Sequence, residues 1–121
     1  MVIVDNSDEV LSALSSVLSD QPDLDVVGVA GGVGEGVMLC RQVQPDVVIL
    51  DVNMPDGGGQ RAAREISTAV PGVRIVAFSA FDKALIRKMM LSAGADAYVS
   101  KSASMPELLA AIRGGSQLAG I

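Results

Sequence analysis

Residues 47–55 read VVILDVNMP, and this stretch decides the fold. Its first four residues, Val47 to Leu50, are apolar on both faces, which is typical of a central parallel strand covered by helices on both sides. Asp51 follows at once, at the carboxyl end of that strand. Pro55 and glycines 57 to 59 then indicate a loop over 51–59. The stretch therefore predicts a parallel sheet with an acidic residue at its carboxyl edge.

Strand and helix patterns alternate along the rest of the chain. Two helix boundaries are clear: Ser104 and Glu107 form a capping-box pattern at a helix start, and Gly94 suits the end of a helix. Alternation repeated five times predicts an α/β fold, a doubly wound (βα)5 parallel sheet with right-handed crossovers. The other strands are expected at 1–4, 26–30, 73–78 and 97–99, and the helices at 8–21, 37–43, 62–70, 85–93 and 105–113, with a flexible passage at glycines 31, 32, 34 and 36.

Composition limits the possible functions. The 121 residues suit one domain over 1–121, with 114–121 as a frayed end or the start of a linker. A net charge of −5 argues against direct contact with duplex nucleic acid, which needs a basic face. The chain has no histidine, so a histidine nucleophile, base or metal ligand within it is excluded. Cys40 is expected to be a small buried hydrophobe. With no apolar run of membrane-spanning length and no signal peptide, a cytoplasmic location is expected.

Polar side chains stand at the ends of four predicted strands. In open parallel sheets ligands bind beyond the carboxyl ends of the strands. Asp5 and Asp51 offer carboxylates there, Ser79 a hydroxyl and Lys101 an ammonium. A carboxylate can attack a phosphoryl group, and the charge of that transfer is normally neutralised by Mg²⁺ and a cationic side chain. The sequence therefore predicts phosphoryl chemistry at this edge.

Several strings of residues resemble the response-regulator receiver family of two-component signalling. They are IVD at 3–5, VILDVNMP at 48–55, AFSA at 77–80, GADAY at 94–98, and Lys101. The resemblance covers nearly the whole chain and implies a flavodoxin-like sheet in the order 2-1-3-4-5. The regulator is expected to be a phosphoacceptor that assists its own phosphorylation and dephosphorylation, and not a dedicated enzyme.

The resemblance also implies residue roles. Asp51 would accept phosphate from a histidine kinase, a phosphotransfer protein or a small phosphodonor. Ser79 would hydrogen-bond the phosphoryl oxygens, and Lys101 would pair with the phosphoryl group or with Asp51. Tyr98 would be an aromatic switch that follows Ser79. The surface of the fourth helix, fifth strand and fifth helix would then change its packing, and could support a homodimer. Four residues would hold Mg²⁺: Asp5, Asn6, Asp51 and the backbone carbonyl of Asn53. Three basic residues could present the switching surface to a partner: Lys83, Arg87 and Lys88.

Two positions depart from the family pattern. Ser102 follows Lys101 where proline is common, as in regulators of the nitrate-response and quorum-sensing type. Asn6 stands where the family usually carries a second acid, so the metal pocket has one negative charge fewer. Weakened Mg²⁺ binding is therefore expected, unless Asp8 compensates.

Two other functions remain open. Because of Asn6, the fold could serve as a phosphorylation-independent interaction module. An α/β phosphatase or flavodoxin-like domain using Asp51 as nucleophile is also conceivable, although Asn53 stands where such a phosphatase would carry a second acid.

Overall fold

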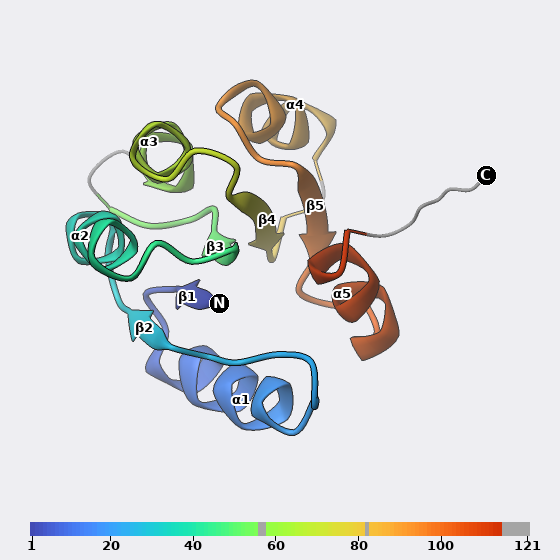
Figure 1. Cartoon of the computed structure of the whole chain (residues 1–121). Helices are drawn as coiled ribbons and strands as arrows, with labels where there is room; N and C mark the ends of the chain where they lie inside the picture. The colour runs from blue at the N-terminus through green and yellow to red at the C-terminus, as the bar shows by residue number, and fades with distance from the viewer. Residues whose placement is uncertain (56–57, 82, 115–121) are drawn as a thin grey trace.

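The computed structural model describes residues 1–55, 58–81 and 83–114. Five parallel strands form one sheet in the order β2-β1-β3-β4-β5, as predicted (Figure 1). Helices α2, α3 and α4 cover one face, and α1 and α5 cover the other. The strands are β1 (Val2–Val4), β2 (Gly28–Ala30), β3 (Val47–Asp51), β4 (Arg74–Ser79) and β5 (Ala97–Ser100). The helices are α1 (Asp8–Ser19), α2 (Val33–Val43), α3 (Gly58–Ala69), α4 (Ala84–Ser92) and α5 (Met105–Ile112).

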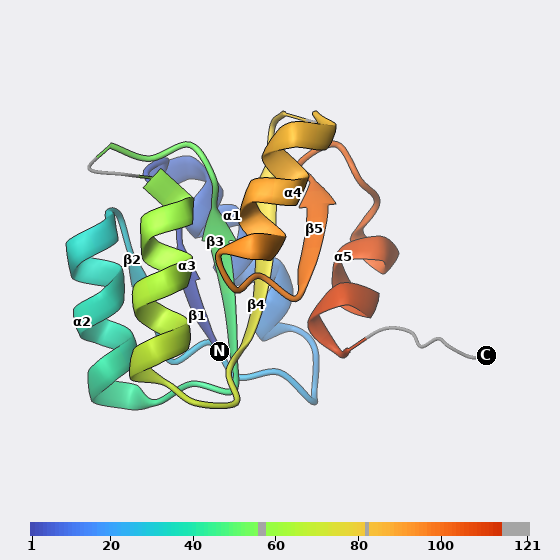
Figure 2. The same ribbon diagram turned by 90° about the horizontal axis from the view of Figure 1, so that it is seen from above.

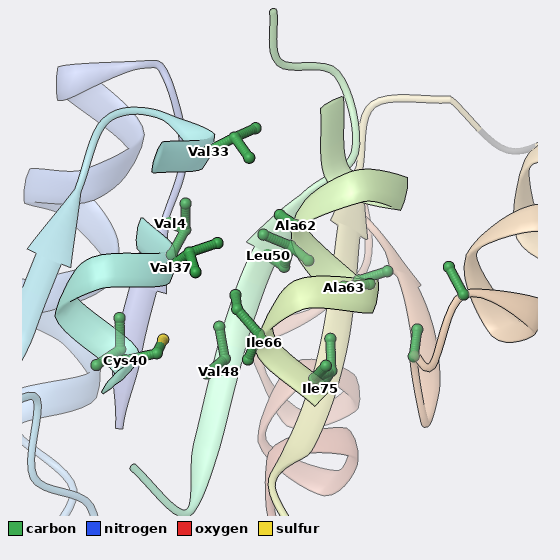
Figure 3. Close-up of a cluster of buried hydrophobic side chains, with 14 of the residues drawn as sticks. Val4, Val33, Val37, Cys40, Val48, Leu50, Ala62, Ala63, Ile66 and Ile75 are labelled. Carbon is green, nitrogen blue, oxygen red and sulfur yellow. The ribbon is translucent and has the colours of Figure 1, made fainter. Parts of the chain in front are cut away.

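Strand β3 lies at the centre of the sheet and feeds both halves of the core. Val48 and Leu50 belong to the cluster under α2 and α3, whereas Ile49, pointing to the opposite face, belongs to the cluster under α1 and α5. Figure 3 shows Val48 and Leu50 beside Ile66 of α3. All three strand residues are at most 1% exposed, so the prediction of a strand buried on both faces is confirmed.

Cys40 of α2 lies in the same core (Figure 3). It is fully buried, and burial raises the pKa of its thiol to about 11. Its expected role as a small hydrophobe is confirmed, because a thiol that stays protonated and buried packs like an aliphatic group.

The flexible passage predicted at the glycines after β2 is wrong in part. Gly32 is the N-cap residue of α2, while Gly34 and Gly36 lie inside the helix. The reason is close packing at Gly36, where a built Cβ would lie 2.8 Å from Val4 Cγ1. The missing side chain lets α2 approach β1, and Figure 3 shows Val37, the next residue of the helix, beside Val4.

The loop predicted over 51–59 ends earlier than expected, because α3 begins at Gly58. A Cβ at Gly59 would lie 2.6 Å from the carbonyl oxygen of Asp51, and the amide of Gly59 donates to the carbonyl of Val52. Glycine is therefore required where the helix returns against the strand end. Gly57, predicted as part of this loop, lies outside the described residues.

The remaining helices begin and end close to the predicted positions. Ser104 caps α5 by accepting a hydrogen bond from the amide of Glu107, and Gly94 follows α4 with a positive φ of 118°. Helix α4 differs from a simple core helix, because Met90 is its only buried residue while Leu85 and Met89 are exposed. Gly115 and the rest of the predicted tail lie outside the described residues. No helix in the described ranges has the length and hydropathy needed to span a membrane.

The contact between Gly36 and Val4 gives a stability test with an internal control. Gly36→Ala adds a methyl group into occupied space, whereas Gly34→Ala adds it on the same helix where nothing lies within 4 Å. Both changes gain helix propensity, so their difference isolates the packing cost. We expect Gly36→Ala to be less stable than Gly34→Ala by about 1–3 kcal/mol in urea unfolding. Equal stabilities would contradict this account of α2.

Candidate functional site

Four strand ends carry the polar side chains that the sequence singles out. Asp5 follows β1, Asp51 ends β3, Ser79 ends β4 and Lys101 follows β5. These strands are neighbours in the sheet, so the four residues meet at its carboxyl edge, the upper edge in Figure 2. Asp5, Asp51 and Ser79 are the buried polar residues among those described, at 1%, 3% and 0% exposure.

The ammonium of Lys101 lies between the two carboxylates. Its Nζ is 2.8 Å from Asp5 Oδ2 and 3.4 Å from Asp51 Oδ1. The backbone of Lys101 is fixed as well, because its amide donates to the carbonyl of Ser79 at 2.7 Å. The predicted pairing of Lys101 with Asp51 is therefore present in the structure, and Asp5 shares the same cation.

Each carboxylate also accepts a backbone hydrogen bond from the loop that follows it. Asp5 Oδ1 accepts from the amide of Ser7 at 2.9 Å, and Asp51 Oδ1 accepts from the amide of Asn53 at 3.2 Å. Asp5 Oδ2 is buried, and among the described residues the Lys101 ammonium, at 2.8 Å, is its partner. Burial of that kind is tolerated only with compensating charge.

The electrostatics of the cluster favour a basic carboxylate beside a firmly charged lysine. Burial raises the pKa of Asp51, the negative charge of Asp5 raises it further, and Lys101 and the Asn53 amide only partly oppose them. Burial by itself would lower the pKa of Lys101, but the two carboxylates outweigh it and the pKa is raised. Lys101 therefore stays protonated at neutral pH, and the proton affinity of Asp51 is above that of an ordinary aspartate.

Ser79 and Tyr98 both hold the loop that leaves β4. Ser79 Oγ accepts from the amide of Phe81 at 3.0 Å, and the Tyr98 hydroxyl donates to the carbonyl of Phe81 at 2.5 Å. The Tyr98 side chain is buried, at 7% exposure, in the core under α4. The structure therefore links the two predicted switch residues through Phe81. Sequence reasoning missed Phe81 because its backbone amide and carbonyl make these two hydrogen bonds, and such bonds do not depend on the type of side chain.

The first loop supplies fewer acids than a metal cluster usually has. Asn6 is exposed beside Asp5, and Asp8 opens α1 and lines a groove with Ser12 and Val29. In the described part of the chain no three acidic, histidine or cysteine side chains gather closely enough to hold a metal. The suggestion that Asp8 compensates for Asn6 is therefore not supported. The buried pair of carboxylates still fits Mg²⁺, which commonly takes one or two carboxylates and keeps several waters.

The β3–α3 loop also borders a cavity of about 200 Å³. Asn53 is exposed at its edge, next to the acidic cluster. Its other lining residues are mostly apolar and come from α3, α4 and the loops before them: Val52, Gln60, Phe81, Ile86, Met89 and Met90.

Comparison with known proteins gives a consistent result. The family profile of the response regulator receiver domain matches residues 1–113. The response regulator GacA of Pseudomonas viridiflava is 34% identical over 113 residues, covering 93% of this chain and 53% of GacA. The DNA-binding transcriptional activator DevR/DosR of Mycobacterium tuberculosis is 34% identical, covering 92% of this chain and 51% of its own. The chain thus spans about half the length of these relatives.

A solved structure agrees in fold. The two-component response regulator of the LuxR family from Aurantimonas sp. SI85-9A1 superposes with a TM-score of 0.88 at 31% identity, over 93% of this chain and 81% of that one.

The raised pKa of Asp51 gives a stability test. Because its folded-state pKa lies above the ordinary value of 3.8, ionisation of Asp51 destabilises the fold as the pH rises above 3.8. Asp51→Asn keeps the shape without the charge. We expect the variant to be more stable than the wild type at pH 7 in urea unfolding, with a difference that shrinks as the pH falls toward 3.8.

Asp23→Asn is the matched control for that measurement. The hydrogen bond from Arg113 lowers the pKa of the exposed Asp23, so removal of its charge brings no gain at pH 7. An Asp51→Asn variant that is no more stable than the wild type at any pH would contradict the electrostatic account of the site.

Proposed function

The chain belongs to the response regulator receiver family of two-component systems, and from this premise we propose that Asp51 accepts a phosphoryl group from a histidine kinase or phosphotransfer protein. One observation carries the proposal: the carboxylate of Asp51 is buried at the sheet edge, basic, and within 3.4 Å of the Lys101 ammonium. A structural aspartate would not need a lysine and a second acid gathered from other strands.

The proposed transfer is a displacement at phosphorus. The described contacts of the carboxylate are made by Oδ1, so Oδ2 is the oxygen proposed to attack. A bond forms between this oxygen and phosphorus while the bond to the leaving group breaks, and the leaving group keeps the electron pair. The raised pKa of Asp51 makes the ionised carboxylate a better nucleophile than an ordinary aspartate.

Lys101 and Ser79 are proposed to hold the transferred group. The ammonium already lies beside Asp51 Oδ1 and would pair with a phosphoryl oxygen in place of some of its present contacts. Ser79 uses only its oxygen, as acceptor, in the bond with the amide of Phe81. Its hydroxyl proton can therefore be donated to the phosphoryl group without breaking that bond.

Mg²⁺ is the proposed cofactor, since receiver domains generally bind it at the phosphorylation site. The residues that would hold it are Asp5, Asp51, the carbonyl of Asn53 and, with a neutral amide in place of an acid, Asn6. When bound, the ion supplies positive charge against the phosphoryl oxygens. Weakened Mg²⁺ binding is expected from the number of acids at the site, because Asn6 contributes no charge and Asp8 does not join Asp5 and Asp51.

The output is proposed to pass through the surface of α4, β5 and α5. Phosphorylation at Asp51 adds charge beside Ser79, which the loop at Phe81 connects to Tyr98. The same surface could pair two copies of the chain. The domain would serve as a phosphoacceptor without being a dedicated enzyme, in the cytoplasm with its kinase. With a net charge of −5, direct contact with nucleic acid is not proposed.

A phosphorylation-independent interaction module is the second candidate. The replacement of an acid by Asn6 favours it, because a poor metal site would slow phosphoryl transfer. The intact trio of Asp5, Asp51 and Lys101 favours the phosphoacceptor instead, since a scaffold gains nothing from burying two like charges. A phosphatase that uses Asp51 has no comparable support in the structure.

Covalent labelling separates these candidates. After incubation with a small phosphodonor and Mg²⁺, intact-mass spectrometry is expected to detect one phosphoryl adduct on the wild type, mapped to Asp51. Asp51→Asn should lose the adduct, while the exposed Asp46→Asn control should keep it. A wild type that never forms the adduct would favour the interaction module, and continuous release of phosphate from a small ester that depends on Asp51 would favour the phosphatase.

The metal site can be tested by restoring the missing charge. Asn6→Asp is expected to tighten Mg²⁺ binding by about tenfold or more, because one further carboxylate would face the ion. Asp8→Asn, which changes an acid outside the cluster, should leave the affinity unchanged. Calorimetric titration measures both. An affinity that Asn6→Asp does not improve would show that Asn6 is not the weak point of the site.

A further inference from the structure

Tyr98 is held on two sides by groups that come from different elements. Its hydroxyl donates to the carbonyl of Phe81 at 2.5 Å, in the loop before α4. The guanidinium of Arg87, on α4, lies over its ring with Cζ 4.9 Å from the ring centroid. The ring is therefore fixed at its polar end by a hydrogen bond and on its face by a cation.

These contacts form a continuous series from the protein surface to the acidic cluster. Arg87 contacts the ring of Tyr98, Tyr98 bonds the carbonyl of Phe81, and the amide of Phe81 bonds Ser79 Oγ at 3.0 Å. Ser79 in turn accepts from the amide of Lys101 through its carbonyl. Each link is a direct contact, so the series is a route by which a movement of the Tyr98 ring would reach Ser79.

Arg87 is well placed to bias the position of that ring. Its backbone amide donates to the carbonyl of Lys83, which fixes it in the first turn of α4. Of the three basic residues at this end of the helix, Lys83, Arg87 and Lys88, Arg87 is the one whose charge lies over the ring in the described structure. A planar guanidinium also stacks on an aromatic face in a way that an ammonium does not.

We infer that Arg87 is a positioning residue, which keeps Tyr98 in its buried rotamer through a cation–π contact and so holds the Phe81 loop against Ser79. The effect of Arg87 on the position of the Tyr98 ring does not depend on the proposed function. The effect on phosphoryl transfer rests on the proposed function, because it concerns how readily Ser79 meets the phosphoryl group. Arg87 thus stabilises the buried position of the ring before any phosphate arrives.

The composition of the chain provides a clean readout. Tyr98 is the only tyrosine and there is no tryptophan, so tyrosine fluorescence reports this ring alone. Acrylamide quenching is to be compared in the wild type, Arg87→Met and Arg87→Lys, with Lys88→Met as the control for loss of a charge from the same helix. We expect Arg87→Met to raise the exposed-to-buried ratio of the ring about two- to fivefold, the effect of losing one exposed cation–π contact. Arg87→Lys should restore part of the protection, and Lys88→Met should match the wild type.

A phosphorylation rate measured on the same variants tests the connection to Ser79. Adduct formation at Asp51 from a small phosphodonor with Mg²⁺ is expected to slow in Arg87→Met and to recover partly in Arg87→Lys. Quenching that is the same in Arg87→Met and the wild type would overturn the inference. Quenching that rises while the adduct forms at an unchanged rate would also overturn it, because the series of contacts would then not transmit. If the wild type forms no adduct, the proposed function fails, and the quenching comparison alone decides the role of Arg87.

Discussion

The structure depends on one arrangement of charge, the Lys101 ammonium between the buried carboxylates of Asp5 and Asp51. Two carboxylates taken out of water repel each other and lose hydration, and neither cost is recovered without a nearby cation. Lys101, which follows β5, provides that cation. The fold therefore keeps a basic, ionisable carboxylate at Asp51 where an ordinary core would have excluded it.

The sheet brings these three residues together although they are distant in sequence. Parallel strands place all their carboxyl ends at one edge. The order β2-β1-β3-β4-β5 makes the strands of Asp5, Asp51, Ser79 and Lys101 consecutive neighbours. Glycine allows the helices to approach closely enough to close the structure around them. Gly36 lets α2 meet Val4, the residue before Asp5, and Gly59 lets α3 begin against the carbonyl of Asp51. The packing of the core and the geometry of the site are thus set by the same contacts.

Much of this arrangement could be predicted from the sequence, and the parts that could not have a physical reason. The apolar run before Asp51 and the capping residue Ser104 carry strong local signals, and both elements form as predicted. Local propensity opposes a helix at Gly34 and Gly36, and the tertiary contact of Gly36 with Val4, which favours the helix, has no signal in the local sequence. The cluster itself followed from strand ends and family resemblance. The link between Ser79 and Tyr98 through Phe81 could not be predicted, because backbone groups form it. The position of Arg87 over Tyr98 could not be predicted either, because it depends on the rotation of α4 about its axis, and the sequence of a helix with one buried residue does not indicate that rotation.

The central claim is that Lys101 holds Asp51 as a charged, basic carboxylate within the fold. Its most direct test is a pH titration of the aspartate side-chain carboxyl carbons by NMR in the wild type and in Lys101→Met. The account predicts that Asp51 titrates above the ordinary value of 3.8 in the wild type, and higher still once the lysine charge is removed. A pKa for Asp51 at or below 3.8, unchanged in Lys101→Met, would contradict it.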